Sequence, residues 1–122
     1  MNIHKSAEDY LEMILMLQQE KGFARSVDIA AALSVSKPSV SVAMKKLREN
    51  GSILMDTDNL ITLTETGEAI ARRMYTRHTV LSQMLMRLGV SEETAREDAC
   101  KMEHDLSEET FAAIQRHLEM YQ

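Results

Sequence analysis

Apolar residues recur three and four positions apart through most of the chain, the spacing that places side chains on one face of a helix. Residues 7–20 follow this pattern and predict a first helix, with Ser6 as its N-cap. Residues 27–33 are rich in alanine and predict a short second helix, with Ser26 at its start. The chain therefore opens with two helices of unequal length.

A third helix is predicted after a tight break at residues 34–36, because Pro38 suits the first turn of a helix. Gly51 marks its end, since glycine commonly follows the last helical residue. The pattern then changes from helical to alternating. Residues 52–55 and 60–63 predict two short strands joined by a polar turn.

The rest of the chain returns to helical spacing. One helix is predicted to start after Thr64 and to close at Gly89, a second to run over residues 91–106, and a third to begin at residue 107. The expected fold is mainly α. We place its domain boundary after the hairpin, with residues 1–63 forming the N-terminal domain and residues 64–122 the second, helical domain.

The segment 26–51 has the form of a helix-turn-helix, and the following hairpin makes it winged. The second helix of such a motif enters the DNA major groove, where small polar and basic side chains suit phosphates and base edges. Any three-helix bundle contains a similar helix pair, and the acidic hairpin tip, Asp56 and Asp58, argues against close DNA contact there. The side chains predicted to contact DNA are Arg25, Ser36, Lys37, Pro38, Ser39, Ser41, Lys45, Lys46, Thr57 and Asn59.

The distribution of charge along the chain bears on a nucleic-acid partner differently from the net charge. The whole chain carries −5, which by itself argues against a nucleic-acid partner. Residues 21–54, however, hold six basic and two acidic side chains, a local +4, whereas residues 64–122 hold seven basic and eleven acidic ones, a local −4. A basic patch is the electrostatic footprint of a phosphate-binding surface, although a solvated helix face has the same composition.

Composition sets further limits. The 122 residues, 44% of them hydrophobic, suffice for one domain or two small halves, and four glycines with one proline favour long helices. A single cysteine excludes an internal disulfide and fits a reducing cytoplasm. The chain has no run of about 18 apolar residues, so we expect no membrane span. Its first residues lack the apolar stretch of a signal peptide.

The segment Cys100-Lys-Met-Glu-His offers three different metal-ligand types at helical spacing. On a helix, Cys100, Glu103 and His104 would share one face, presenting a thiolate, a carboxylate and an imidazole together. The alternative is a buried cysteine beside an exposed acid. Asp9 and Glu12, one turn apart in the first predicted helix, and the lone His78 are weak signals by themselves.

Several motifs, in order along nearly the whole chain, resemble the diphtheria toxin repressor-like family of iron- and manganese-dependent transcriptional repressors, in its short two-domain form. The resemblance rests on Glu8-Asp9-Tyr10-Leu11-Glu12, Asp28-Ile29-Ala30 with Ser39-Val40-Ser41, Leu63-Thr64-Glu65-Thr66-Gly67, Arg77-His78, and Glu103-His104-Asp105-Leu106-Ser107. It implies a winged-helix DNA-binding half followed by a helical dimerisation and metal-binding half, with metal bound where the two halves meet.

The resemblance also implies a set of metal ligands: Asp9, Glu12, His78, Cys100, Glu103 and His104. The chain departs from both family branches, since the manganese branch has a carboxylate at the position of Cys100 and the iron branch has methionine at that of Asp9. Three hard carboxylates favour Mn(II), with Fe(II) the near alternative, and the thiolate also admits Zn(II) or Co(II) in vitro.

The function implied is that of a metal-loaded homodimer that binds a palindromic operator in double-stranded DNA. Apolar positions in residues 79–90 and 110–121 are expected to supply the dimer contacts. We expect neither enzymatic activity nor a small-molecule substrate. Two alternatives remain open at this point. One is a winged-helix regulator without metal control, and the other is a metalloenzyme with Glu103 as its base, although no nucleophile motif or glycine-rich loop supports it.

Overall fold

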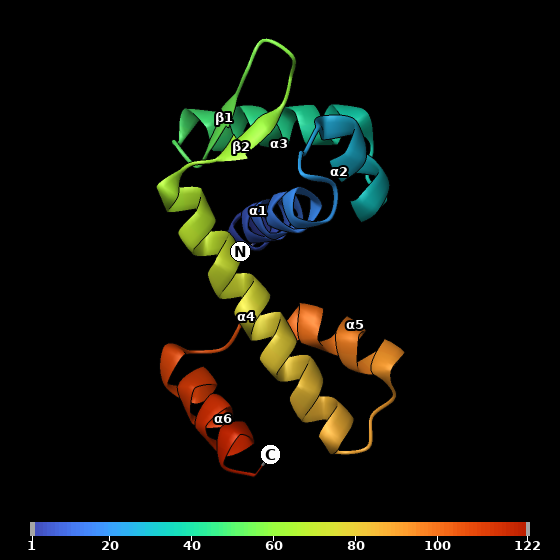
Figure 1. The fold of residues 1–122 in the computed structure, drawn as a ribbon, viewed down its shortest axis with the longest axis vertical. Coiled ribbons are helices and arrows are strands. Elements are labelled where there is room, and N and C mark those ends of the chain that lie inside the picture. Colours follow the sequence, from blue (N-terminus) through green and yellow to red (C-terminus); the bar gives the residue numbers. More distant parts are fainter. Residues whose placement is uncertain (1, 122) are drawn as a thin grey trace. The chain divides into compact units, whose positions relative to one another are not determined.

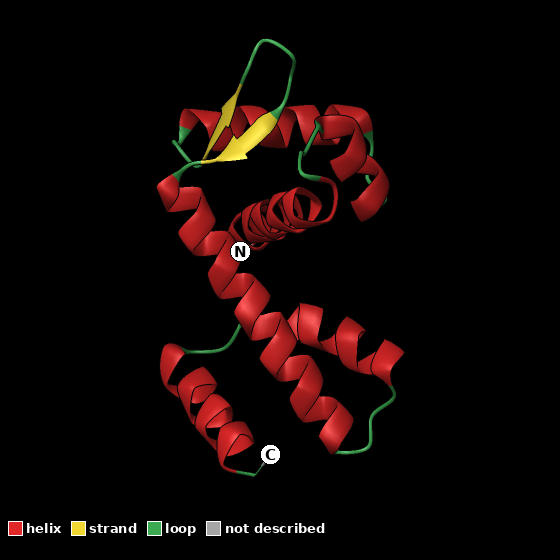
Figure 2. Cartoon of the chain, viewed as in Figure 1, coloured by secondary structure: helices red, strands yellow, loops and turns green. Residues whose placement is uncertain are grey.

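The computed structural model describes the backbone of residues 2–121 and consists mainly of helices (Figures 1 and 2). The chain divides after Arg72 into two units, each of which is described below by itself. Within the described residues the elements are, in chain order, α1 (Asn2–Lys21), α2 (Ser26–Leu33), α3 (Lys37–Glu49), β1 (Ile53–Met55), β2 (Ile61–Leu63), α4 (Glu65–Arg87), α5 (Glu92–Met102) and α6 (Glu108–Met120).

The first unit is a winged helix-turn-helix, as the sequence predicts. Helices α2 and α3 meet at a bend of 119°, within the range of DNA-binding helix pairs. Its core combines the apolar face of α1 with side chains from α2, α3 and the hairpin, including Leu11, Ile14, Ile29, Val40 and Met44. Removing these side chains from water provides the main force that holds the helix pair together.

The break between α2 and α3 lies where it is predicted. Ser34 adopts the left-handed conformation, with φ 55°, and ends α2. Ser36 is the N-cap of α3, because its hydroxyl oxygen accepts a hydrogen bond from the Ser39 amide at 3.2 Å. Pro38 occupies the first turn, and Gly51, with φ +81°, follows the helix end. These local signals fix the orientation of α3.

The predicted hairpin is also confirmed. Strands β1 and β2 pair antiparallel, with Leu54 opposite Thr62, and Ile61 forms an additional bridge to Ala24. The turn is held by Asp56, whose Oδ1 accepts hydrogen bonds from the amides of Asp58 at 2.8 Å and Leu60 at 2.9 Å. One of the two acidic side chains at the tip therefore stabilises the turn itself.

Three predicted helix boundaries are wrong. Helix α1 begins at Asn2, so Ser6 lies inside the helix and is not its N-cap. Helix α2 already includes Ser26, and its N-cap is Arg25, whose side chain makes no capping hydrogen bond. Helix α5 ends at Met102 rather than at residue 106, because the chain turns at the next residues. A serine inside a longer helix and a serine that caps a helix look the same in the sequence.

The second unit consists of the C-terminal part of α4 together with α5 and α6 (Figure 1). Ser91 and Ser107 cap α5 and α6 by accepting hydrogen bonds from the amides three residues later. Some apolar side chains that the sequence assigns to dimer contacts are instead buried within their own chain: Leu81, Phe111 and Leu118. Leu88, by contrast, is 74% exposed and stays available for such contacts.

No single helix among residues 2–121 is both long enough and apolar enough to cross a membrane. Helices α2 and α3 reach the required length and composition only when they are counted together across their bend.

Gly67 illustrates a close approach that positions the start of α4. Thr64 caps this helix by accepting a hydrogen bond from the Gly67 amide at 3.2 Å, and its own hydroxyl donates to the Gly51 carbonyl at 2.7 Å. A Cβ atom at position 67 would overlap the backbone carbonyl of Ser52. The contact is with backbone, so a larger residue could be accommodated only by displacing the hairpin from α4.

We predict that Gly67→Ala lowers the free energy of unfolding by about 1–3 kcal/mol, the usual cost of overpacking. The sign is informative, because glycine to alanine in a helix normally stabilises by up to about 1 kcal/mol. Thermal unfolding followed by circular dichroism measures the effect. Thr66→Ala, at an exposed position of the same turn, is the control and should not destabilise. Equal stability of the wild type and Gly67→Ala would contradict the close approach.

Candidate metal centre and nucleic-acid surface

The cysteine and the carboxylate of the C-terminal motif keep their helical relationship although α5 ends between them. Glu103 is the C-cap residue and retains helical backbone angles, with φ −61° and ψ −24°. Its amide donates to the Ala99 carbonyl at 3.0 Å. Cys100 and Glu103 therefore project from the same side of the helix end, whereas His104 belongs to the turn that follows.

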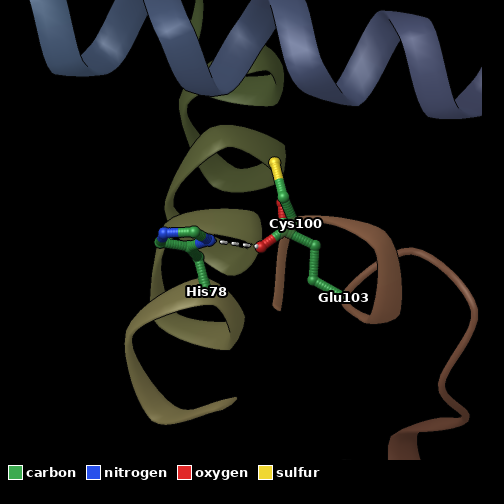
Figure 3. A group of neighbouring side chains, drawn as sticks. All are labelled: His78, Cys100 and Glu103. Atoms are coloured by element: carbon green, nitrogen blue, oxygen red, sulfur yellow. Dashed lines mark hydrogen bonds and ion pairs between the residues drawn. The ribbon is translucent and has the colours of Figure 1, made fainter. Parts of the chain in front are cut away.

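His78 from α4 completes a three-residue cluster with Cys100 and Glu103, shown in Figure 3. One potential ligand atom from each residue lies within 4.8 Å of the other two. The closest pair is His78 Nδ1 and Glu103 Oε2, at 3.2 Å. Nδ1 donates in this contact when it carries the imidazole hydrogen, and Nε2 is then the nitrogen with the free lone pair. The spacing predicts Cys100 together with Glu103, the family resemblance adds His78, and the structure brings the three together.

The Glu103 carboxylate lies between two imidazoles. Oε2 faces His78, and Oε1 is 3.6 Å from Nε2 of His104, too far for a hydrogen bond. Glu103 is fully buried, and its Oε1 has no hydrogen-bond partner among the described residues. A buried carboxylate oxygen without a partner costs free energy, and a bound cation removes that cost. The donor set of carboxylate, imidazole and thiolate fits a divalent transition metal.

Asp9 and Glu12 lie on α1, in the first unit. Their spacing of three residues places both carboxylates on the same side of the helix. Glu12 is 7% exposed, which is unusual for a glutamate, and Asp9 is half-buried. These two predicted ligands therefore lie on one side of α1, within the first unit.

Arg77 is a residue of the site to which the sequence reasoning gave no role. It precedes His78 in α4, is buried, and donates a hydrogen bond from Nη1 to the backbone carbonyl of Glu103 at 3.0 Å. The only signal in the sequence is a basic residue beside a candidate ligand. Its carbonyl partner is 26 residues away along the chain, and sequence spacing does not show such a contact.

The candidate DNA surface centres on α3. All ten side chains predicted to contact DNA belong to exposed residues. A groove of about 690 Å³ lies within the first unit, between α2, α3 and the hairpin turn. The polar and charged residues lining it are Arg25, Ser26, Ser41, Lys45, Arg48, Asp58 and Asn59. Three positive charges against one negative charge suit a phosphate backbone.

Two predicted DNA contacts have a structural role as well. Ser36 caps α3, and its hydroxyl also donates to Ser39 Oγ at 2.8 Å. Arg25 lies over the ring of Phe23, with Cζ 5.5 Å from the ring centre, a distance at which a cation–π contact restrains the side chain. Its guanidinium is therefore partly preorganised at the edge of the groove.

Comparison with known proteins agrees with this division of roles. Residues 2–58 match the family described as iron dependent repressor, N-terminal DNA binding domain. Residues 64–122 match the family described as iron dependent repressor, metal binding and dimerisation domain. The chain is 45% identical over 107 residues to the transcriptional regulator MntR of Escherichia coli O6:H1, covering 88% of this chain and 69% of that protein.

Further relatives extend the likeness. The HTH-type transcriptional regulator MntR of Lysinibacillus sphaericus is 41% identical over 102 residues, covering 84% of this chain and 73% of the relative. A solved structure described as a manganese-dependent transcriptional repressor in complex with manganese superposes with a TM-score of 0.84 at 30% identity. That match covers 95% of this chain and 54% of the other, so the present chain spans about half the length of the solved relative.

The burial of Glu103 leads to a prediction for metal binding. We expect Glu103→Gln to weaken Mn(II) binding by at least about 100-fold, because the neutral amide removes the charge that faces both imidazoles. The rise in unfolding temperature on adding Mn(II) measures this, since a ligand that binds only the folded state stabilises it. Glu93→Gln, an exposed change on the same helix, is the control and should keep the full rise. An undiminished rise in Glu103→Gln would exclude Glu103 as a ligand.

Proposed function

The chain belongs to the family of iron-dependent repressors and MntR-type transcriptional regulators, and from that premise we propose that it is a metal-activated repressor of manganese or iron homeostasis. In this proposal a metal-loaded homodimer binds a palindromic operator in double-stranded DNA, in the cytoplasm. The observation that carries the proposal is the buried Glu103 carboxylate, flanked by two imidazoles and lacking a hydrogen-bond partner for Oε1 among the described residues.

The proposed metal site uses six side chains from three segments: Asp9 and Glu12 of α1, His78 of α4, and Cys100, Glu103 and His104 at the end of α5. When bound, the metal supplies positive charge that neutralises the carboxylates. His78, Cys100 and Glu103 each offer one potential ligand atom within 4.8 Å of the other two. Asp9 and Glu12 contribute their pair of carboxylates from the first unit, so the complete set exists only when the two units are held together.

The ligand chemistry favours Mn(II), with Fe(II) as the near alternative. Three carboxylates are hard ligands, which suit Mn(II) and Fe(II), whereas the Cys100 thiolate shifts the preference toward Fe(II), Co(II) and Zn(II). Affinity alone would select Zn(II) over Mn(II), so selectivity depends on coordination number and on which metal is available. The solved relative described as a manganese-dependent transcriptional repressor supports the first choice.

The proposed switch is a linkage between metal binding and DNA binding. Without a cation, the carboxylates of Asp9, Glu12 and Glu103 repel one another when the units approach. With a cation, the approach becomes favourable, and the DNA-reading unit is fixed against the dimerising unit. The metal thus favours the DNA-competent arrangement by the difference in its affinity for the two states. Two recognition helices in a dimer are then held at the spacing of two operator half-sites.

On the DNA side, we assign α3 to the major groove. Ser39, Ser41 and Lys45 are exposed on it, and Lys37 and Pro38 lie at its N-terminus. Arg25 and Asn59 border the groove beside α3, and Thr57 lies at the hairpin tip, where backbone contacts are expected. Lys46 adds positive charge for phosphates.

The switch predicts that operator affinity rises at least about tenfold when Mn(II) or Fe(II) is added to the metal-free protein, a typical allosteric coupling. Fluorescence anisotropy with labelled operator DNA, in buffer with chelator or with excess metal, measures it. Lys45→Ala should weaken binding in both conditions, because it removes a phosphate contact and leaves the metal site intact. Equal operator affinity with and without metal would contradict the switch and would support the alternative, a winged-helix regulator without metal control.

The position of Cys100 predicts a change of metal preference. Cys100→Glu should raise the affinity for Mn(II) relative to Zn(II), because a hard oxygen replaces a soft sulfur. Isothermal titration with Mn(II), Fe(II) and Zn(II), on the wild type and the variant, gives the ranking. Cys100→Ser is the matched control for size. An unchanged ranking in both variants would make Cys100 a bystander.

A further inference from the structure

Arg77 of α4 contacts the chain segment after α5 at several points. Its Nη1 donates to the backbone carbonyls of Glu103, at 3.0 Å, and Leu106, at 2.8 Å. Its Nη2 donates to Glu108 Oε1 at 3.2 Å, and its guanidinium lies 5.2 Å from the ring centre of Phe111. One side chain therefore contacts the beginning and the end of the connection between α5 and α6.

This connection carries two of the candidate metal ligands. Helix α5 ends at Met102, so Glu103 and His104 lie at and beyond its end, where backbone carbonyls lack the hydrogen bonds of a continuing helix. Arg77 supplies the missing donor to the Glu103 carbonyl. The position of the Glu103 backbone, and with it the direction of its carboxylate toward His78, thus depends on the guanidinium of the neighbouring residue in α4.

Stability alone gives a poor reason for this arrangement. Arg77 is 4% exposed, while its carboxylate partner Glu108 has a side chain that is 78% exposed, so the desolvation of the cation is only partly repaid. The Nε of Arg77 also lacks a hydrogen-bond partner among the described residues. What the guanidinium does achieve is geometric, because Nη1 holds two carbonyls at once while Nη2 reaches Glu108.

We propose that Arg77 is a positioning residue for the metal centre and couples that centre to α6. It holds Glu103 in the orientation that a cation needs, and through Leu106 and Glu108 it ties this orientation to the start of α6. Occupation of the metal site and docking of α6 on α4 therefore reinforce each other. This inference rests on the proposed function, since it presumes that the cluster binds a metal.

Arg87 provides a matched control within the same chain. It lies on α4 as well, and its Nη1 donates to the carbonyls of Leu118, at 3.3 Å, and Tyr121, at 3.0 Å. Arg87 thus clamps the C-terminal end of α6 much as Arg77 clamps its beginning. Its hydrogen bonds go to the C-terminal end of α6, and it lies nine residues beyond His78, so a merely structural clamp and a positioning residue can be separated.

The test compares Arg77→Gln, Arg77→Lys and Arg87→Gln with the wild type as full chains. Unfolding of the metal-free proteins reports on the clamp, and Mn(II) titration reports on the site. We expect both glutamine variants to lower the unfolding temperature. Only Arg77→Gln should also weaken Mn(II) binding, by about 10–100-fold, as for residues that orient metal ligands. Arg77→Lys should fall between it and the wild type, because lysine keeps the charge but its single nitrogen cannot donate from the positions of both Nη1 and Nη2.

The outcomes are distinguishable. If the wild type binds Mn(II) and both Arg77 variants bind it within twofold of Arg87→Gln, Arg77 is only a clamp and the inference is wrong. If Arg77→Gln does not fold, Arg77→Lys decides, and wild-type affinity in that variant overturns the inference. If the wild type itself binds no Mn(II), Fe(II) or Zn(II), the proposed function fails first, whatever the variants do. As a further readout, the Co(II) absorption spectrum should change in Arg77→Lys and remain unchanged in Arg87→Gln.

Discussion

The second unit is organised around a carboxylate that is fully buried. Glu103 is 0% exposed, faces His78 on one side and His104 on the other, and has one oxygen without a hydrogen bond among the described residues. Burying such a group is costly unless a cation compensates it. A cation bound at this position would remove that cost, and binding that differs between two states shifts the equilibrium between them.

Much of the fold can be read from the sequence because its signals are local. The helix-turn-helix depends on Ser34 in the left-handed conformation, the Ser36 cap and Pro38 in the first turn, and each is visible as a residue type at a fixed offset. The end of α5 at Met102 is not visible in this way, because no glycine or proline follows it. The contact of Arg77 with the carbonyls of Glu103 and Leu106 helps to explain that early end, and it is non-local.

The candidate site likewise has a part that follows from local sequence and a part that depends on non-local packing. Cys100 and Glu103 are close because three residues make nearly one helical turn, so their spacing alone predicts them. His78 joins them through the packing of α4 against α5, and only the family resemblance could indicate it beforehand. His104 departs from the simple picture of one helix face, because it lies in the turn and approaches the other oxygen of Glu103. The turn thus brings a second imidazole to the Glu103 carboxylate, beside that of His78 from α4.

The candidate DNA surface and the candidate metal centre differ in how far sequence alone can predict them. DNA contacts come from exposed side chains on a helix, so residue type and helical position suffice to propose them, and Arg25, Lys45 and Asn59 indeed border one groove. The candidate metal centre depends on a buried carboxylate and on backbone carbonyls that accept hydrogen bonds from Arg77, which is distant in sequence. A metal-dependent regulator needs both kinds of surface. The metal site must gain free energy when it binds its cation, whereas the DNA-binding surface must stay exposed to DNA. The division of this chain after Arg72, within α4, separates these two demands and leaves one helix to connect them.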